Sequence, residues 1–319
     1  MQSKRRQRPR PVPAAAEGSR RVEAALREQQ RLLRAAAARL SDAGSDDIHD
    51  GRVAARRMRS LLKTFRPMLD VRCARLMRAD LRSFARSLAL VREADVRRDL
   101  LVDLSRGDPL LAAEDSQRLA TLLDDRCLEA RTSLARHVAE PGWSALAAVL
   151  QSESAIADLR IRPDVTLAEV LRQVNESWKV AVRRLESEPT DTAGLHALRL
   201  ALKHGRYALE PVADVVPDEV GELQRRLRAA QEGIGEHRDV VLAGHWLSSN
   251  ESALGGTLTR RLLAQLGRRQ KRLRIMASKR ARRVLPALRR WRKASSAVMK
   301  GTKPGRSSRA AARRSAAPS

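Results

Sequence analysis

The stretch from Asp46 to Met68 combines an apolar helical face with a row of cations that has no acidic counterpart. Its apolar residues recur at spacings of three and four, which predicts one amphipathic helix that begins near Asp46 and ends at Pro67. Beside the apolar face runs a row that we call the first ladder: His49, Arg52, Arg56, Arg59 and Lys63. Because helical positions three or four apart share a flank, these side chains form a cationic strip on the order of 20 Å long.

A row of Arg and Lys on a helix is most often a solvated charged face. Such a face usually interleaves Asp or Glu three or four residues away, whereas no acid occurs between Gly51 and Leu69. The missing acids favour a ladder that binds an external anion over one that only faces water.

A second ladder lies between Gly194 and Pro211. Its members are His196, Arg199, Lys203 and Arg206, each 147 residues after the corresponding member of the first ladder. Farther along, the segment 91–96 is echoed by the segment 237–242, which lies 146 residues later. Two matches in the same order indicate an internal duplication.

The paired H-x-x-R-x-x-x-[RK]-x-x-R helices, each followed by a long helix with an Arg-acid segment, resemble the CHAD family, the conserved histidine α-helical domain. The resemblance covers roughly Ser19 to Trp291. It implies an all-α fold of two pseudo-symmetric helical bundles, here expected with four helices each, and a basic central surface that binds inorganic polyphosphate. The second copy departs from the first where His204 replaces Arg57 and where Glu210 stands at the position of Lys63.

Two glycines and two Arg-acid segments qualify this picture. Gly51 and Gly205 interrupt the two ladder helices, and each costs about 1 kcal/mol of helix stability relative to Ala. The Arg-acid pairs, Arg92 with Asp95 and Arg238 with Asp239, are interpreted as arginines held by nearby acids. In that role they would brace each long helix against a ladder helix.

The expected domain is one duplicated unit at 19–292, with copies at about 19–139 and 166–292 and a linker at about 140–165. The basic Pro- and Ala-rich segments 1–18 and 293–319 are expected to be disordered tails. Helices are predicted at about 20–40, 46–68, 71–105, 112–138, 167–188, 193–214, 218–249 and 258–291. Pro286 is expected to kink or end the last one.

The formal net charge of +27 is segregated along the chain. The segment 17–254 is nearly neutral, whereas Gly255 to Ser319 contain no Asp or Glu. The two cysteines, Cys73 and Cys127, lie in predicted helices, which is typical of a reducing compartment. No run of apolar residues is long enough to span a bilayer, and we expect a cytoplasmic protein that does not enter membranes.

The chain lacks the sequence motifs of metal, nucleotide and thiol-redox sites. Some CHAD proteins resemble fusions with a triphosphate tunnel domain that has an E-x-E-x-K motif. The most similar segment here is Glu186-Ser187-Glu188, and it is followed by Pro189 and Thr190, so it lacks the lysine of that motif. No carboxylate pair is placed to hold Mg²⁺ beside a nucleophile. We therefore expect no enzyme activity, no catalytic residue, no cofactor and no metal.

Anion binding remains, and arginine suits it because its planar fork makes charge-assisted bonds to phosphate oxygens. The two histidines are predicted in the first turns of their helices, where free N–H groups favour an anion, although a capping or core role is the alternative for either alone. The predicted phosphate-binding residues are His49, Arg52, Arg56, Arg57, Arg59, Lys63, His196, Arg199, Lys203 and Arg206. Secondary candidates are Arg126, Arg131, Tyr207, Arg268, Arg272 and Lys279. Tyr207 either donates to phosphate or packs, and the Arg-rich last helix either extends the groove or faces solvent.

Two classes of function fit these residues. The first is non-enzymatic binding of inorganic polyphosphate in a groove between the two ladders, and storage, regulation or targeting to polyphosphate granules are all compatible with it. The second is a nucleic-acid-binding protein that acts through its basic tails and last helix. Exposed aromatic residues would support base stacking, and the chain has only seven aromatics, which favours the first class.

Overall fold

The computed structural model describes residues 16–40, 44–189 and 191–301, and the regular secondary structure in these ranges is entirely helical. The prediction of an all-α fold is therefore confirmed. The first part of the chain forms α1 (Glu17–Ala37), α2 (Ser45–Thr64), η3 (Arg66–Met68), α3 (Val71–Arg106), α4 (Ala113–Val138) and α5 (Pro141–Gln151). The turns η4 (Glu153–Ala155) and η5 (Ala157–Leu159) lead to α6 (Leu167–Ser177), α7 (Lys179–Glu186), α8 (Thr192–Ala208), η6 (Glu210–Val212), α9 (Pro217–Ser249), α10 (Glu251–Leu254), α11 (Gly256–Arg282) and α12 (Val284–Gly301).

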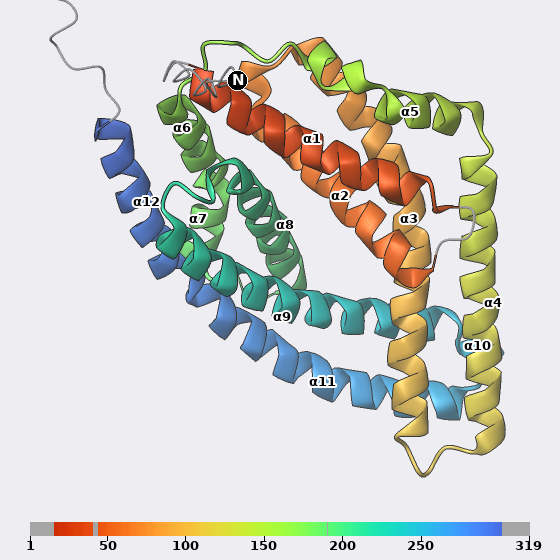
Figure 1. Cartoon of the computed structure of the whole chain (residues 1–319). Coiled ribbons are helices and arrows are strands. Elements are labelled where there is room, and N and C mark those ends of the chain that lie inside the picture. The colour runs from red at the N-terminus through yellow and green to blue at the C-terminus, as the bar shows by residue number, and fades with distance from the viewer. Residues whose placement is uncertain (1–15, 41–43, 190, 302–319) are drawn as a thin grey trace, which may run out of the picture.

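The helices are arranged around two long pairs. α3 and α4 form one antiparallel pair, and α9 and α11 form a second pair that meets the first near α10 (Figure 1). α2 packs against α1, α3 and α8, while α8 packs against α7 and α9. The two ladder helices are consequently neighbours, each with its own long helix on the other side.

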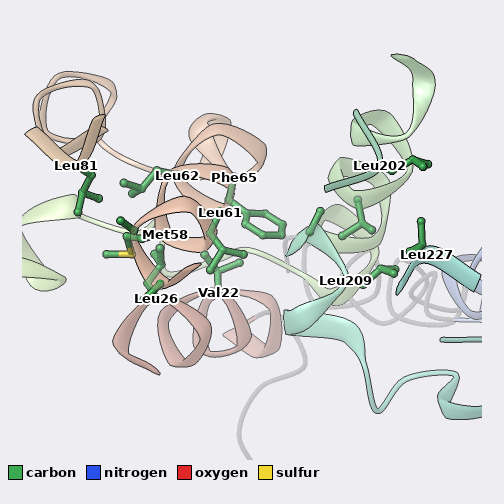
Figure 2. Close-up of a cluster of buried hydrophobic side chains, with 14 of the residues drawn as sticks. Val22, Leu26, Met58, Leu61, Leu62, Phe65, Leu81, Leu202, Leu209 and Leu227 are labelled. Atoms are coloured by element: carbon green, nitrogen blue, oxygen red, sulfur yellow. The ribbon is translucent and has the colours of Figure 1, made fainter. Parts of the chain in front are cut away.

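One hydrophobic core holds both ladder helices. It extends from α1, α2 and α3 to α8 and α9, as Figure 2 shows. Its labelled members are Val22, Leu26, Met58, Leu61, Leu62, Phe65, Leu81, Leu202, Leu209 and Leu227. A separate cluster around Leu101, Leu119 and Leu247 forms where the two long pairs meet. Each buried leucine stabilises the fold by about 1.5–3 kcal/mol, so the ladder helices are oriented by their apolar faces.

The segment 140–165 is not a simple linker, because it contains α5. Pro141 is the first residue of this helix, a position where the missing N–H costs nothing. Trp143, Leu146 and Leu150 are buried, and the Trp143 ring stacks on Phe84 with centroids 4.6 Å apart. The low charge of this segment therefore reflects burial against α3 and not a flexible connection.

The expected last helix at 258–291 is also wrong in its bounds. The helix is interrupted at Arg283, between α11 and α12, and α12 continues through Gly301. Pro286 lies in the first turn of α12, where backbone N–H groups have no partner within the helix. Trp291 and Ser295 are buried, so packing extends beyond the expected start of the tail at 293. The remaining parts of the expected tails, 1–15 and 302–319, lie outside the described residues.

Gly205 permits a close approach that its helix propensity does not reveal. A Cβ at this position would lie 2.5 Å from the ring of Trp178, a fully buried side chain between α6 and α7. Gly51 plays a similar part in α2, where a Cβ would lie 3.0 Å from the Cβ of Ala36. Both glycines lower helix propensity and allow their ladder helix to pack tightly.

We expect Gly205→Ala to destabilise the protein by about 1–3 kcal/mol, because the added methyl overpacks the Trp178 ring. Gly267→Ala in α11 is the matched control, since a Cβ there meets nothing within 4 Å. The control should gain about 1 kcal/mol from its higher helix propensity. Urea unfolding followed by circular dichroism measures both, and equal stabilisation of the two variants would contradict the packing role of Gly205.

Candidate functional site

The two ladders lie side by side because α2 and α8 pack with their cationic flanks together. Arg56 Nε donates a hydrogen bond to Tyr207 Oη at 3.1 Å, and Ser60 Oγ lies 3.3 Å from His204 Nδ1. These contacts join one helix to the other from the middle of α2 toward its end. Both contacts therefore lie between the C-terminal halves of the two helices, which places the later parts of the two ladders side by side.

A groove that we call the central groove opens between these helices, α3 and α9. One part is a cavity of about 160 Å³ lined by His49, Arg52, Arg56, Arg92, Glu93, Val96, Arg97, Arg199, Lys203, Arg238, Asp239, Leu242 and Ala243. The adjoining part is lined by His49, Val53, Arg56, Arg199, Lys203, Arg206, Tyr207, Arg228, Gln231, Glu232, Gly235, Glu236 and Asp239. The shared residues make the two parts continuous. Six of the ten predicted binding residues meet here: His49, Arg52, Arg56, Arg199, Lys203 and Arg206.

Lys203 is the most deeply placed cation of the groove, with 8% of its surface exposed. Burial lowers the pKa of its ammonium group to about 5, and nearby guanidinium groups, that of Arg56 foremost, act in the same direction. No ion pair to Lys203 occurs in the described ranges. In the unliganded protein at neutral pH, this amine is therefore uncharged.

Arg199 is held close to the backbone of α9. A Cβ on Gly235 would lie 3.2 Å from Arg199 Nη2, so this glycine leaves room for the guanidinium group. Burial lowers the pKa of Arg199 to about 10, and Asp239 opposes the shift. Burial also raises the pKa of Asp239, against the effect of the surrounding arginines. Asp239 thus offsets only part of the positive charge of the groove.

Three arginine side chains pack around the ring of Tyr207. Its ring is 2% exposed, and the guanidinium carbons of Arg56, Arg57 and Arg206 lie 6.0, 5.7 and 5.4 Å from the ring centroid. Its hydroxyl accepts the bond from Arg56. Tyr207 lines the groove, but its burial and contacts show that it packs and positions the arginines.

Comparison with known proteins agrees with this arrangement. The family model of the CHAD domain matches residues 23–248. The chain belongs to the CHAD domain family. The crystal structure of the CHAD domain from the plant Ricinus communis has a TM-score of 0.67 and 23% sequence identity, with 87% of this chain and 97% of that chain covered. PptA from Streptomyces chartreusis has a TM-score of 0.66 and 21% identity, with 85% of this chain and 99% of that chain covered. No match was found among curated proteins.

The four other predicted binding residues of the two ladder helices lie beside the groove or outside it. Arg57 Nε lies 3.4 Å from Glu210 Oε1, so the acid that replaces a ladder cation in the second copy pairs with the first copy. Arg59 faces arginines of α3, and Lys63 is exposed near His204. The Nδ1 atom of His196 is buried without a hydrogen-bond partner, and burial lowers the pKa of this ring, as does Arg238.

The two ladder histidines do not lie in the first turns of their helices. His49 and His196 are each the fifth residue of α2 and α8, beyond the four N–H groups that lack an intrahelical partner. Anion binding by these residues therefore depends on the imidazole rings. The pKa of His49 is lowered by burial and by Arg92.

The secondary candidates other than Tyr207 lie outside the central groove. On α4, Arg126 pairs with Glu129 at 2.8 Å and Arg131 pairs with Asp95 at 3.1 Å. On α11, Arg268 and Arg272 line a separate depression, where Arg261 pairs with Asp108. Lys279 is exposed on the same helix. Helical spacing assigned these residues to cationic faces but could not tell which neighbouring helix each face meets.

The Arg-acid pairs differ from the expected bracing contacts. Asp95 binds Arg131 of α4, and the partner of Arg238 is Glu93 of α3, whose Oε1 lies 3.5 Å from Nη2. The brace therefore joins the two long helices to each other. Sequence reasoning also missed the groove-lining role of Arg92 and Arg97, although the 146-residue echo had marked the segment that contains Arg92.

Two kinds of feature are absent from the described ranges. No group of three or more His, Cys, Asp or Glu residues there could hold a metal ion. None of the helices in that part of the chain is long and apolar enough to cross a bilayer.

We expect Lys203→Met to raise the free energy of unfolding, and to do so most at low pH. The pKa of the Lys203 amine is 10.5 in the unfolded chain and about 5 in the folded protein. Between these two pH values the amine is neutral in the folded protein and protonated in the unfolded chain. The native protein therefore gains stability as pH rises through this window, by about 1.4 kcal/mol per pH unit for one proton, and the variant lacks this dependence. Urea unfolding at pH 6, 8 and 10 in phosphate-free buffer measures the difference between the two proteins.

The control for this experiment is Lys293→Met, which replaces an exposed lysine of α12. Its stability difference from the native protein should stay level with pH. A Lys203→Met difference that is equally level would show that the amine is charged in the folded protein.

Proposed function

We propose that this CHAD protein binds inorganic polyphosphate in the central groove without acting on it chemically. The observation that carries the proposal is the meeting of two ladders, 147 residues apart, around a buried lysine that has no acidic partner within the described ranges. Guanidinium groups hold phosphate oxygens with charge-assisted bonds, and a bound polyanion would relieve the repulsion between the ladders. The family is associated with polyphosphate or triphosphate binding, which supports the same ligand class.

Unused donors in the groove support an anionic ligand. Gln231 Nε2 is buried without a hydrogen-bond partner, and its Oε1 accepts a bond of 2.8 Å from Arg206 Nη1. His196 Nδ1 beside the groove is likewise buried and unpartnered, and it is a donor in the tautomer that carries its proton there. A buried donor without a partner costs about 1–3 kcal/mol, and phosphate oxygens would satisfy such donors.

A non-enzymatic role fits the lining of the groove. No Ser, Thr or Cys is among its described residues, so it offers no aliphatic hydroxyl or thiol nucleophile, and the Tyr207 hydroxyl already accepts a bond from Arg56. In those same ranges Tyr207 is its only Phe, Tyr or Trp side chain, and this ring is buried among arginines and offers no free face to a nucleobase. A thin phosphate chain therefore suits the groove better than a nucleic acid. Nucleic-acid binding remains the alternative for the basic ends of the chain and for the arginines of α11.

We also infer that the two ladders descend from one duplicated helical unit, arranged as pseudo-symmetric bundles. Residues 147 positions apart lie close enough for their charges to interact. The charge of Arg56 lowers the pKa of Lys203, and the charge of Arg52 lowers the pKa of Arg199. In a cell, such a groove would place the protein on cytoplasmic polyphosphate granules.

The quadruple variant Arg52→Gln, Arg56→Gln, Arg199→Gln and Lys203→Met tests the groove. Each lost charge-assisted bond is worth about 1.5–3 kcal/mol, so affinity for long-chain polyphosphate should fall on the order of 100-fold or more. Isothermal titration calorimetry measures the affinity. The control makes the same kinds of substitution at four exposed cations of α6, α7 and α12: Arg172, Arg183, Arg292 and Lys293. If both variants lose affinity equally, binding follows overall charge and not the groove.

Polyphosphate binding should take up about one proton per bound chain at pH 7 through Lys203. The amine is neutral in the free groove, with a pKa of about 5, and a bound polyanion raises that pKa. Binding therefore strengthens as pH falls. Calorimetry in two buffers of different ionisation enthalpy measures the uptake, and Lys203→Met should lower it by about one proton. Identical proton uptake by the native protein and the variant would show that Lys203 does not contact the ligand.

Competition between polymers separates the two function classes. A chain reduced to residues 16–301 keeps every helix that the structure describes and loses the basic ends. We expect this protein to keep its preference for polyphosphate over duplex DNA, with weaker DNA binding and a shallower salt dependence than the full chain. If DNA displaces polyphosphate from residues 16–301, nucleic-acid binding becomes the better assignment.

A further inference from the structure

A second group of arginines lies on the α3 side of the first ladder. We call it the arginine arm, and its members are Arg59 of α2 and Arg78, Arg82 and Arg86 of α3. Burial lowers the pKa of Arg59, and the charges of Arg82, Arg78 and Arg86 lower it further. The Nε atoms of Arg59 and Arg78 are buried without hydrogen-bond partners. Over residues 16–40, 44–189 and 191–301, none of the four forms an ion pair.

The arginine arm continues the central groove. On α2, Arg59 follows the groove residues Arg52 and Arg56 along the same ladder. On α3, Arg78, Arg82 and Arg86 are spaced by four residues, and Arg97 lies farther along at the groove. Two adjacent helices thus carry cations outward from the groove in the same direction. Lys63 lies at this end as well, exposed to solvent.

The corresponding positions on the other side of the groove are different. At a spacing of 146 residues, Gln224 stands for Arg78, Arg228 for Arg82, and Glu232 for Arg86. Arg206, the counterpart of Arg59, already donates a bond of 2.8 Å to Gln231. Glu232 and Glu236 line that part of the groove, and Glu210 stands at the position of Lys63. The two exits from the groove therefore differ in charge.

We propose that the arginine arm is an extension subsite that holds the end of a long polyphosphate chain as it leaves the central groove on the α2–α3 side. This inference rests on the proposed function. A long chain occupies the groove and the arm together, so its contact with the arm is intramolecular once the groove is filled. A tripolyphosphate ion is short, so it occupies the groove without reaching the arm. The arm therefore makes affinity depend on chain length. The α8–α9 side, where Glu210 and Glu232 replace two cations, is less basic, and this difference gives the bound chain a direction.

The triple variant Arg78→Gln, Arg82→Gln and Arg86→Gln tests the arm. It should weaken binding of long-chain polyphosphate roughly tenfold or more, because three phosphate contacts are lost. Tripolyphosphate affinity should change by less than about twofold, since distant exposed charges are screened within about 8 Å at physiological salt. The control removes the same charge elsewhere, through Arg172→Gln, Arg183→Gln and Arg292→Gln. Calorimetry with both ligands at constant ionic strength gives the four ratios.

A second variant adds the arm where it is absent. Gln224→Arg places on α9 the cation that Arg78 supplies on α3 146 residues earlier, and it leaves the groove residue Glu232 unchanged. Affinity for long chains should rise roughly tenfold, with tripolyphosphate affinity raised much less. No gain, or an equal gain for both ligands, would contradict the assignment of direction to these charges.

The possible results separate this inference from the proposed function. If the native protein binds neither ligand, the proposed function fails. If the native protein binds both, and the triple variant binds long chains as tightly as the native protein does, only the extension subsite fails. An equal loss for long chains and tripolyphosphate would also overturn it, because it would show a general field effect.

Discussion

The structure depends on one hydrophobic core that two cationic helices share. The apolar faces of α2 and α8 enter the same hydrophobic cluster, and this packing brings their cationic flanks together. The result is a lysine at 8% exposure beside several arginines. Hydrophobic burial supplies the free energy that holds this repulsive arrangement in place, at about 25 cal/mol per Å² of apolar surface. The unliganded groove is therefore a preorganised cluster of cations.

The surrounding residues keep the cations positioned without neutralising them. Tyr207 presents its ring to three guanidinium groups, and Gly235 leaves space for Arg199. Glu93 pairs with Arg238 within the groove and Glu210 pairs with Arg57 beside it, while Arg52, Arg56 and Lys203 form no ion pair in the described ranges. Preorganisation of this kind lowers the entropy cost of binding, because the arginines need not be gathered when the ligand arrives. It also distinguishes the groove from a flexible basic segment, which binds by charge alone.

Much of the fold and part of the site could be predicted from helical periodicity. The ladder spacing identified α2 and α8 and the cations Arg52, Arg56, Arg199 and Lys203, because positions three and four apart share a flank in any helix. Periodicity within one helix says nothing about the partner helix. The burial of α5, the pairing of Arg131 with Asp95, and the placement of Arg92 and Arg97 in the groove depend on contacts between helices.

The amino-acid sequence by itself determined the all-α fold class, the two ladders and their 147-residue spacing, since these follow from local periodicity. Only the tertiary structure decided that the ladders share a groove, that Lys203 is buried and Lys63 exposed, and that Arg59 turns toward α3. The physical reason is that exposure and electrostatic environment are properties of packed neighbours. Lys203 and Lys63 are both ladder lysines, but Lys203 is enclosed by guanidinium groups and burial lowers its pKa to about 5, whereas Lys63 faces water.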